Sequence, residues 1–124
     1  MNQEILELLA EKKYSAVKQL IGQMEEADLA KLFEELENEE DADQFNRLLP
    51  KETAAEVFSY MEPEIQEKIV RTLTDTELQH ILDDLFMDDY VDLVEEMPAN
   101  VVKRVMQNTT PANRKLINQY LKYP

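Results

Sequence analysis

Apolar side chains recur along this chain at spacings of three and four residues, which is the pattern of helices that bury one face. The clearest sets are Val57, Phe58 and Met61; Ile65, Ile69, Val70 and Leu73; Leu78, Ile81, Leu82 and Leu85; Leu93, Val94 and Met97; and Val101, Val102, Val105 and Met106. Residues that favour helix starts separate these sets at intervals of ten to thirteen positions, namely Pro50, Pro63, Thr74–Asp75, Asp88, Pro98 and Pro111. The pattern therefore predicts short helices joined by tight turns.

This spacing predicts about ten helices, and the single glycine in 124 residues argues against a sheet with tight hairpins. The approximate spans are 2–12, 14–24, 27–37, 40–49, 51–60, 63–72, 75–86, 88–96, 98–107 and 111–121. Helices this short are marginal alone, so their neighbours must stabilise them. We expect an all-α fold in which helical hairpins stack into a superhelical solenoid. No linker interrupts the pattern, so residues 1–124 are expected to form a single helical-repeat domain.

The composition excludes several classes of partner. The formal net charge is −14, yet 44% of the residues are hydrophobic, which is too many for a disordered acidic tail. A surface this acidic repels nucleic acid and anionic membranes. No apolar run approaches the ~20 residues of a membrane span, and the acidic N-terminal stretch is unlike a signal peptide. We therefore expect a soluble chain that contacts neither nucleic acid nor membrane directly.

Catalytic residues are not recognisable in the sequence. The chain has no cysteine, and the one histidine, His80, has Asp83 and Asp84 three and four positions later, which is not a known metal or catalytic set. No serine has a matching histidine and aspartate. We expect the protein not to be an enzyme, and we assign Phe58, Tyr60, Phe86 and Met87 to the core or its rim.

Acidic residues are concentrated in one segment of the chain. Nine lie between Thr72 and Val102, where there is no lysine or arginine, and no acid follows Glu96. Asp88 and Asp89 open the predicted helix 88–96, where acids cap free N–H groups and complement the helix dipole. Asp88, Asp92 and Glu96, however, share one helix face, where like charges destabilise a helix. Two interpretations stay open, a solvated acidic face and a site for a hard divalent cation such as Mg²⁺.

Three stretches of the sequence carry a resemblance to a known family. They are LPKETAAEVFSYMEPEIQEKIVRTL (residues 49–73), MDDYVDLVEEMP (residues 87–98) and INQYLKYP (residues 117–124). In this order they resemble the cytoplasmic N domain of the MgtE family of magnesium transporters, most clearly from Arg47 to Pro124. The family often has proline before the paired aspartates, where this chain has Met87. The last stretch is similar to the segment that leads into a tandem CBS domain, so we expect the chain to be truncated before CBS and transmembrane domains.

The resemblance implies a regulatory role on the cytoplasmic side of a membrane. In the family, Mg²⁺ held between the N domain and the CBS domain of the same chain closes the pore of a homodimeric transporter. Carried over to this sequence, the implied Mg²⁺ ligands are Asp88, Asp92 and Glu56, with Asp89 and Glu96 as second choices. Oxygen ligands alone do not distinguish Mg²⁺ from Mn²⁺ or Ca²⁺.

A protein-interaction adaptor is the alternative from another functional class. Similar helical repeats occur in flagellar rotor proteins, where a groove binds a partner helix. The basic C-terminal residues Lys103, Arg104, Arg114 and Lys115 would then form a docking face for an acidic partner. This hypothesis predicts no response to Mg²⁺ beyond that of ionic strength.

Overall fold

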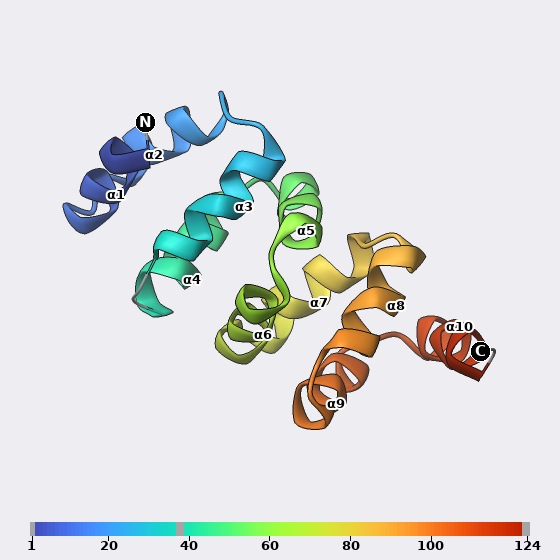
Figure 1. The fold of residues 1–124 in the computed structure, drawn as a ribbon. Helices are drawn as coiled ribbons and strands as arrows, with labels where there is room; N and C mark the ends of the chain where they lie inside the picture. The colour runs from blue at the N-terminus through green and yellow to red at the C-terminus, as the bar shows by residue number, and fades with distance from the viewer. Residues whose placement is uncertain (1, 37–38, 123–124) are drawn as a thin grey trace. The chain divides into compact units, whose positions relative to one another are not determined.

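The computed structural model describes residues 2–36 and 39–122, and this part of the chain forms ten helices and no strand (Figure 1). The helices are α1 (Asn2–Ala10), α2 (Tyr14–Ile21), α3 (Glu26–Glu35), α4 (Glu39–Leu48), α5 (Lys51–Tyr60), α6 (Pro63–Thr72), α7 (Asp75–Asp84), α8 (Met87–Glu96), α9 (Ala99–Gln107) and α10 (Pro111–Lys122). The all-α prediction is confirmed, and α5 and α6 have the predicted bounds. The predicted end of the third helix, residue 37, lies outside the described residues.

Local chemistry explains where the first two helices end earlier than predicted. Lys12 has a positive φ of 61°, which an α-helix cannot contain, and α1 ends at Ala10. Gly22 is the C-cap of α2, so the helix stops at Ile21 rather than continuing to residue 24. Because glycine weakens a helix interior, it favours this earlier end.

From α5 to α9 the helices are joined by turns of two extended residues. The turns are Met61–Glu62, Leu73–Thr74, Leu85–Phe86 and Met97–Pro98, with φ between −92° and −61° and ψ between 141° and 163°. The first residue of each turn is apolar, and these apolar residues are spaced twelve positions apart. One helix plus one turn therefore occupies twelve residues, and the position of the turns fixes the length of this repeat.

The chain divides into two compact units, residues 1–61 and 62–124. In the first unit α3 packs against α5, α1 against α2, and α4 against both α1 and α2. Phe33 and Phe45 meet edge to face with ring centroids 4.9 Å apart, the geometry that aromatic quadrupoles favour. The most closely packed pair, α3 and α5, is not consecutive in the chain, because α4 lies between them in sequence.

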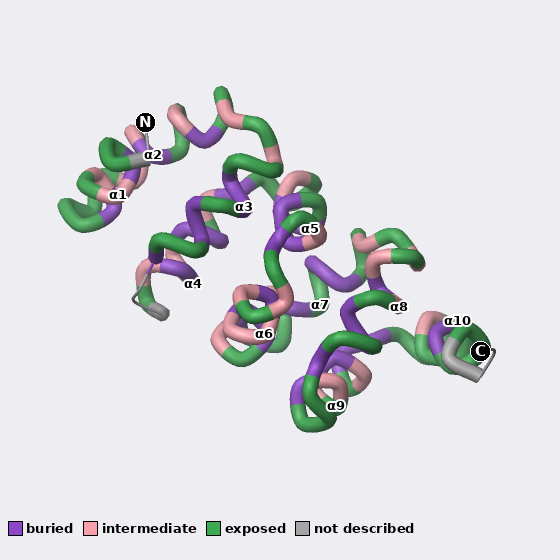
Figure 2. The backbone as a smooth tube through the Cα atoms, viewed as in Figure 1, coloured by how far each residue is buried: buried purple, intermediate pink, exposed green. Residues whose placement is uncertain are grey.

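In the second unit α6 packs against α9 and α8 against α10. The buried apolar side chains come from the predicted sets, with Tyr90 and Ile117 in addition: Ile69, Val70, Leu73, Leu78, Ile81, Leu82, Tyr90, Leu93, Val94, Met97, Val101, Val105 and Ile117. Figure 2 shows α10 with mostly exposed positions. Among the α10 residues whose burial is described, only Ile117 is buried. The last helix is therefore attached to its unit by a narrow face.

Candidate functional site

The acidic segment forms α8, whose first turn lacks the usual cap. The N-cap residue is Phe86, no side chain caps the helix, and the N–H of Tyr90 bonds to the carbonyl of Phe86 at 3.0 Å. The expectation that Asp88 and Asp89 cap this helix is therefore wrong. The helix begins one residue earlier, at Met87, which places both aspartates inside the first turn. In this position the negative charges of Asp88 and Asp89 still interact favourably with the helix dipole.

Three carboxylates of α8 form an exposed line along the helix. Asp88, Asp92 and Glu96 are exposed, while Asp89 is half-buried. Within residues 2–36 and 39–122, no hydrogen bond or ion pair involves any of these four side chains. Consecutive members of the line are one helical turn, about 6 Å, apart along the axis. Their mutual repulsion is therefore not relieved by a cation from the described part of the chain.

The structure does not gather these carboxylates into a complete metal site. Among the described residues, no group of three or more histidine, cysteine, aspartate or glutamate side chains is placed to hold a metal ion. Glu56, the other candidate ligand, is exposed on α5 in the first unit, whereas α8 belongs to the second unit. Hard carboxylate oxygens suit Mg²⁺, which commonly binds one or two carboxylates and keeps several waters. The donor set on α8 therefore fits part of a site for a hydrated ion.

Tyr90, which the sequence analysis did not single out, anchors α8. Its side chain is 1% exposed, and its hydroxyl bonds to the hydroxyl of Thr109, in the connection between α9 and α10. Burial raises the pKa of Tyr90 above its ordinary value, the Thr109 bond lowers it, and the nearby Asp83 charge raises it further. A tyrosine inside an apolar helical set was the available signal, because a buried phenol needs a polar partner.

The four residues assigned to the core or its rim do not share one environment. Phe58 is buried and Met87 half-buried, whereas Phe86 is 77% exposed and Tyr60 is also exposed. Phe86 is exposed because it occupies the N-cap of α8, a turn position outside the helical apolar pattern.

Arg104, one of the predicted docking residues, is engaged inside the second unit. Its Nη2 donates to the carbonyl of Leu73 at 2.6 Å and to Asp75 Oδ1 at 3.2 Å, and its side chain is only 27% exposed. Asn108 extends this cluster, since its Nδ2 donates to the carbonyl of Arg104 at 2.9 Å and its Oδ1 accepts from Gln79 Nε2 at 3.0 Å. Arg104 therefore joins α9 to the turn between α6 and α7, and we no longer assign it to docking.

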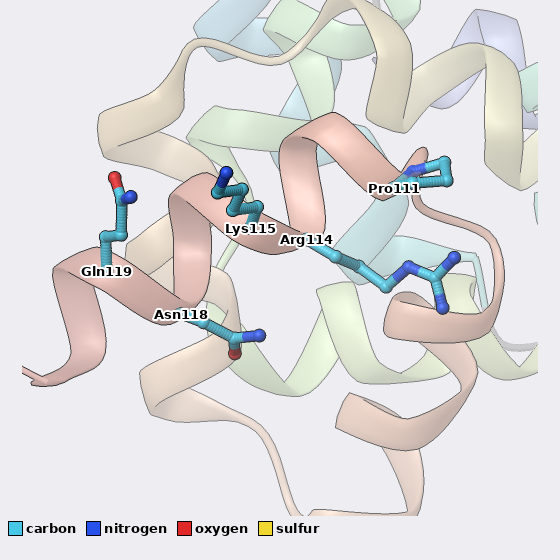
Figure 3. Close-up of a pocket in the computed structure, with 5 residues that line it drawn as sticks. All are labelled: Pro111, Arg114, Lys115, Asn118 and Gln119. Carbon is cyan, nitrogen blue, oxygen red and sulfur yellow. The ribbon is translucent and has the colours of Figure 1, made fainter.

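The other three basic candidates lie on exposed surface. Lys103 is on α9, and Arg114 and Lys115 are on α10. A shallow depression of about 450 Å³ runs along α10 and is lined by Pro111, Arg114, Lys115, Asn118 and Gln119 (Figure 3). In this view Lys115 and Gln119 point to one side of the helix and Arg114 and Asn118 to another.

Two apolar side chains of the same helix are also exposed. Leu116 is 43% exposed and Tyr120 is 54% exposed, and these two side chains, one helical turn apart, lie about 100° around the helix from Lys115 and Gln119. This surface therefore combines positive charge with apolar contact area. None of the helices in the described residues is both long and apolar enough to cross a membrane.

Comparison with known proteins identifies the class of this helical domain. The sequence model of the family of MgtE intracellular N domains matches residues 24–124, which is most of the chain and includes α3 to α10. The chain therefore belongs to the family of MgtE intracellular N domains, as the sequence motifs suggested. No curated protein matches the chain.

A solved structure supports the same assignment. The chain is similar to a crystal structure described as the cytosolic domain of the Mg²⁺ channel MgtE in complex with ATP, with 29% sequence identity and a TM-score of 0.82. The similarity covers 100% of this chain and 51% of that chain. The chain thus spans about half the length of that cytosolic domain, and its fold is the one found there.

Proposed function

We propose that this domain is a Mg²⁺-sensing regulatory part of a magnesium transporter or channel, on the cytoplasmic side of the membrane. Membership in the MgtE N-domain family and the similarity to the cytosolic domain of a Mg²⁺ channel support the class. The observation that carries the proposal is the line of exposed carboxylates Asp88, Asp92 and Glu96, with no partner among the described residues. Such a line is costly to the isolated helix and useful where a cation is to be bound.

In the proposed mechanism Asp88 and Asp92 supply one half of the binding site. Two carboxylates one turn apart can contact a single hydrated ion, with Asp89 and Glu96 as further oxygen donors. The remaining donors come from the CBS domain that we expect to follow in the full-length chain. Glu56 on α5 remains a proposed ligand.

Regulation then follows from a difference in Mg²⁺ affinity between two states. When Mg²⁺ is scarce, the carboxylates of α8 repel an acidic face of the CBS domain, and the two domains separate. When Mg²⁺ is abundant, ions between the domains remove the repulsion and favour the closed state of the homodimeric transporter. A ligand shifts such an equilibrium only by its preference for one state, so several weakly bound ions together give a sharper response.

The first test titrates the 124-residue chain with MgCl₂ and follows backbone amides by NMR, with KCl samples of matched ionic strength. Wild type should show Mg²⁺-specific shifts centred on α8, which Asp88→Asn/Asp92→Asn abolishes. The matched control is Glu4→Gln/Glu7→Gln, which removes the same charge from exposed positions of α1 and should leave the α8 shifts intact. Shifts that KCl reproduces would contradict a self-contained site on α8 and leave its aspartates at most half of a site. Mg²⁺-specific shifts that survive in Asp88→Asn/Asp92→Asn would contradict ligation by these two aspartates.

The second test addresses gating in the complete transporter. Asp88→Ala/Asp92→Ala should require a higher Mg²⁺ concentration for closure, because the closed state loses ligands that the open state does not use. Recordings of ion flux at graded Mg²⁺ concentrations measure this shift. An unchanged Mg²⁺ dependence would show that these two aspartates are not ligands in the closed state.

The exposed surface of α10 supports a second candidate function, docking of an acidic protein segment. Arg114 and Lys115 offer charge and Leu116 and Tyr120 offer apolar contact. Lys103 on α9 is a further exposed cation. Arg114→Glu/Lys115→Glu should then weaken binding to the isolated CBS domain without Mg²⁺, whereas Lys18→Glu/Lys31→Glu in the first unit should not. Equal affinity of the two variants would contradict docking through α10.

A further inference from the structure

The connection between α9 and α10 is a three-residue joint, Asn108, Thr109 and Thr110. Thr110 caps the start of α10, because its hydroxyl oxygen accepts from the N–H of Asn113 at 3.2 Å and its carbonyl accepts from the N–H of Arg114 at 2.9 Å. The conformation of this joint therefore sets the direction in which α10 leaves α9.

Thr109 binds the joint to the acidic helix α8. Its Oγ1 donates to the carbonyl of Val105 at 2.6 Å, which uses its only hydroxyl proton. In the short bond between the two hydroxyls, Tyr90 is consequently the donor and Thr109 the acceptor. Both residues are buried, since Tyr90 is 1% exposed and Thr109 is 6% exposed. A chain of two hydrogen bonds thus runs from α8 through the joint to the end of α9.

A hydroxyl at position 109 departs from the twelve-residue repeat that begins after α5. The twelve-residue spacing places apolar residues at Met61, Leu73, Leu85 and Met97, and the next position in the series is Thr109. An apolar side chain there would need no partner, whereas a buried hydroxyl is costly unless it is bonded. Departures from a local rule concentrate at functional positions. The Tyr90–Thr109 pair replaces a non-directional apolar contact with a directional bond.

Tyr90 lies within one helical turn of both carboxylates that the proposed function uses. Asp88 and Asp92 are two positions away on either side, on the exposed face, while Tyr90 points into the unit. Because one turn of helix moves as a rigid body, a displacement of the exposed carboxylates also displaces the Tyr90 hydroxyl. The packing of α8 against α10 brings the two helices close enough for this displacement to matter.

We propose that the Tyr90–Thr109 hydrogen bond couples ion binding on α8 to the orientation of α10. This inference rests on the proposed function. It adds the path by which ion binding on α8 would be transmitted to α10, the exposed helix that carries Arg114, Lys115, Leu116 and Tyr120. Tyr90 and Thr109 are positioning residues in this scheme, since neither touches the ion. Coupling between two sites means that a change at one site alters the equilibrium at the other, so the experiment must measure the response of α10 to a change on α8.

A second hydrogen bond to the same joint serves as a control, because it does not involve α8. Gln79 Nε2 donates to Asn108 Oδ1 at 3.0 Å, which ties the joint to α7 and not to α8. Gln79→Ala therefore loosens the same connection without interrupting the route from the carboxylates. A change that arises only from a less stable joint appears in Gln79→Ala as well, whereas a change in coupling does not.

The experiment follows amide shifts of α8 and α10 in the 124-residue chain, in MgCl₂ and in KCl of matched ionic strength. Wild type, Tyr90→Phe, Thr109→Val, Thr109→Ser and Gln79→Ala are compared. We expect the α10 shifts to follow the α8 shifts in wild type, Thr109→Ser and Gln79→Ala. In Tyr90→Phe and Thr109→Val the α8 shifts should remain and most of the α10 response should be lost. A full α10 response in both of these variants overturns the inference.

A metal-free arm separates this inference from the proposed function. Asp92→Asn perturbs α8 without any ion, and its effect on α10 amides is compared with and without Tyr90→Phe. If MgCl₂ shifts nothing but Asp92→Asn reaches α10 only when Tyr90 is present, the coupling stands and ion sensing by this chain fails. If neither perturbation of α8 reaches α10 in the wild-type background, the coupling is overturned.

Discussion

α7 and α8 are consecutive helices of equal length, each with two acids in the first turn, yet their carboxylates have different surroundings. In α7, Thr74 and Glu77 form a reciprocal capping box, with Glu77 N–H donating to Thr74 Oγ1 at 3.2 Å and Thr74 N–H to Glu77 Oε1 at 3.1 Å. Asp75 pairs with Arg104 at 3.2 Å. The two first-turn acids of α7 are therefore explained by the stability of the fold.

The acids of α8 have no such explanation. Phe86 provides no cap, and Asp88, Asp92 and Glu96 have no partner among the described residues. What anchors α8 is its apolar face together with the hydroxyl of Tyr90. The contrast shows that acid content alone does not identify a functional helix, because the first-turn acids of α7 serve the fold whereas the line of Asp88, Asp92 and Glu96 makes no hydrogen bond or ion pair within the part of the chain that the structure describes.

The largest effect should come from the anchor of α8. Tyr90→Ala removes a fully buried ring, and we expect a loss of about 3–5 kcal/mol in the free energy of unfolding, as for other large aromatic truncations. Urea denaturation followed by circular dichroism measures it. Tyr60→Ala, at an exposed aromatic of similar size, should change little. Similar losses in both variants would show that burial of Tyr90 is not what holds α8.

Loss of a cap should be costly for α7 and not for α8. Thr74→Ala removes the side-chain acceptor of the capping box, and we expect a loss of about 0.5–2 kcal/mol. Phe86→Ala removes no capping bond and should stay within about 0.5 kcal/mol of wild type. Phe86→Ser, which introduces a capping side chain, should stabilise the protein. Thermal melts of the three variants compare the helices directly, and a larger cost for Phe86→Ala than for Thr74→Ala would reverse the comparison.

The hydroxyl of Tyr90 should make a contribution that depends on pH. At neutral pH Tyr90→Phe should lose about 1 kcal/mol, since Thr109 loses its donor. Burial raises the pKa of Tyr90, so above pH ~10 the folded protein holds a proton that the unfolded chain releases. Wild-type stability therefore falls as pH rises through this range, and the deficit of Tyr90→Phe shrinks. Urea denaturation at neutral and alkaline pH tests this, and a deficit that grows with pH would contradict it.

The smallest effect concerns the charges themselves. Asp92→Asn relieves the repulsion with Asp88 and Glu96, so it should stabilise the chain by roughly 0.2–0.5 kcal/mol at low salt. Asp75→Asn removes an exposed ion pair with Arg104 and should destabilise it by a similarly small amount. Melting temperatures at low and high salt give the two signs. If both substitutions have the same sign, the distinction between the acids of α7 and α8 is lost.

Most of the fold was predictable because helical periodicity and turn residues act locally. The spacing of Ile65, Ile69 and Val70, for example, needs only a helix and a neighbour to define which face is buried. The candidate site was predictable only as residue types. Asp75 and Asp88 look alike as first-turn acids, and Arg104 and Arg114 look alike as basic residues after the acidic segment. Nothing local separates the members of either pair.

The sequence by itself determined the ten helices, their twelve-residue spacing from α5 onward and the location of the acids on α8, since these depend on contacts within one or two turns. Tertiary structure decided which charges are used internally. Arg104 reaches Leu73 and Asp75, about thirty residues away in the chain, and Tyr90 reaches Thr109 in the joint before α10. Such pairings arise from how helices pack, and packing depends on the shapes of whole faces rather than on spacing along the chain.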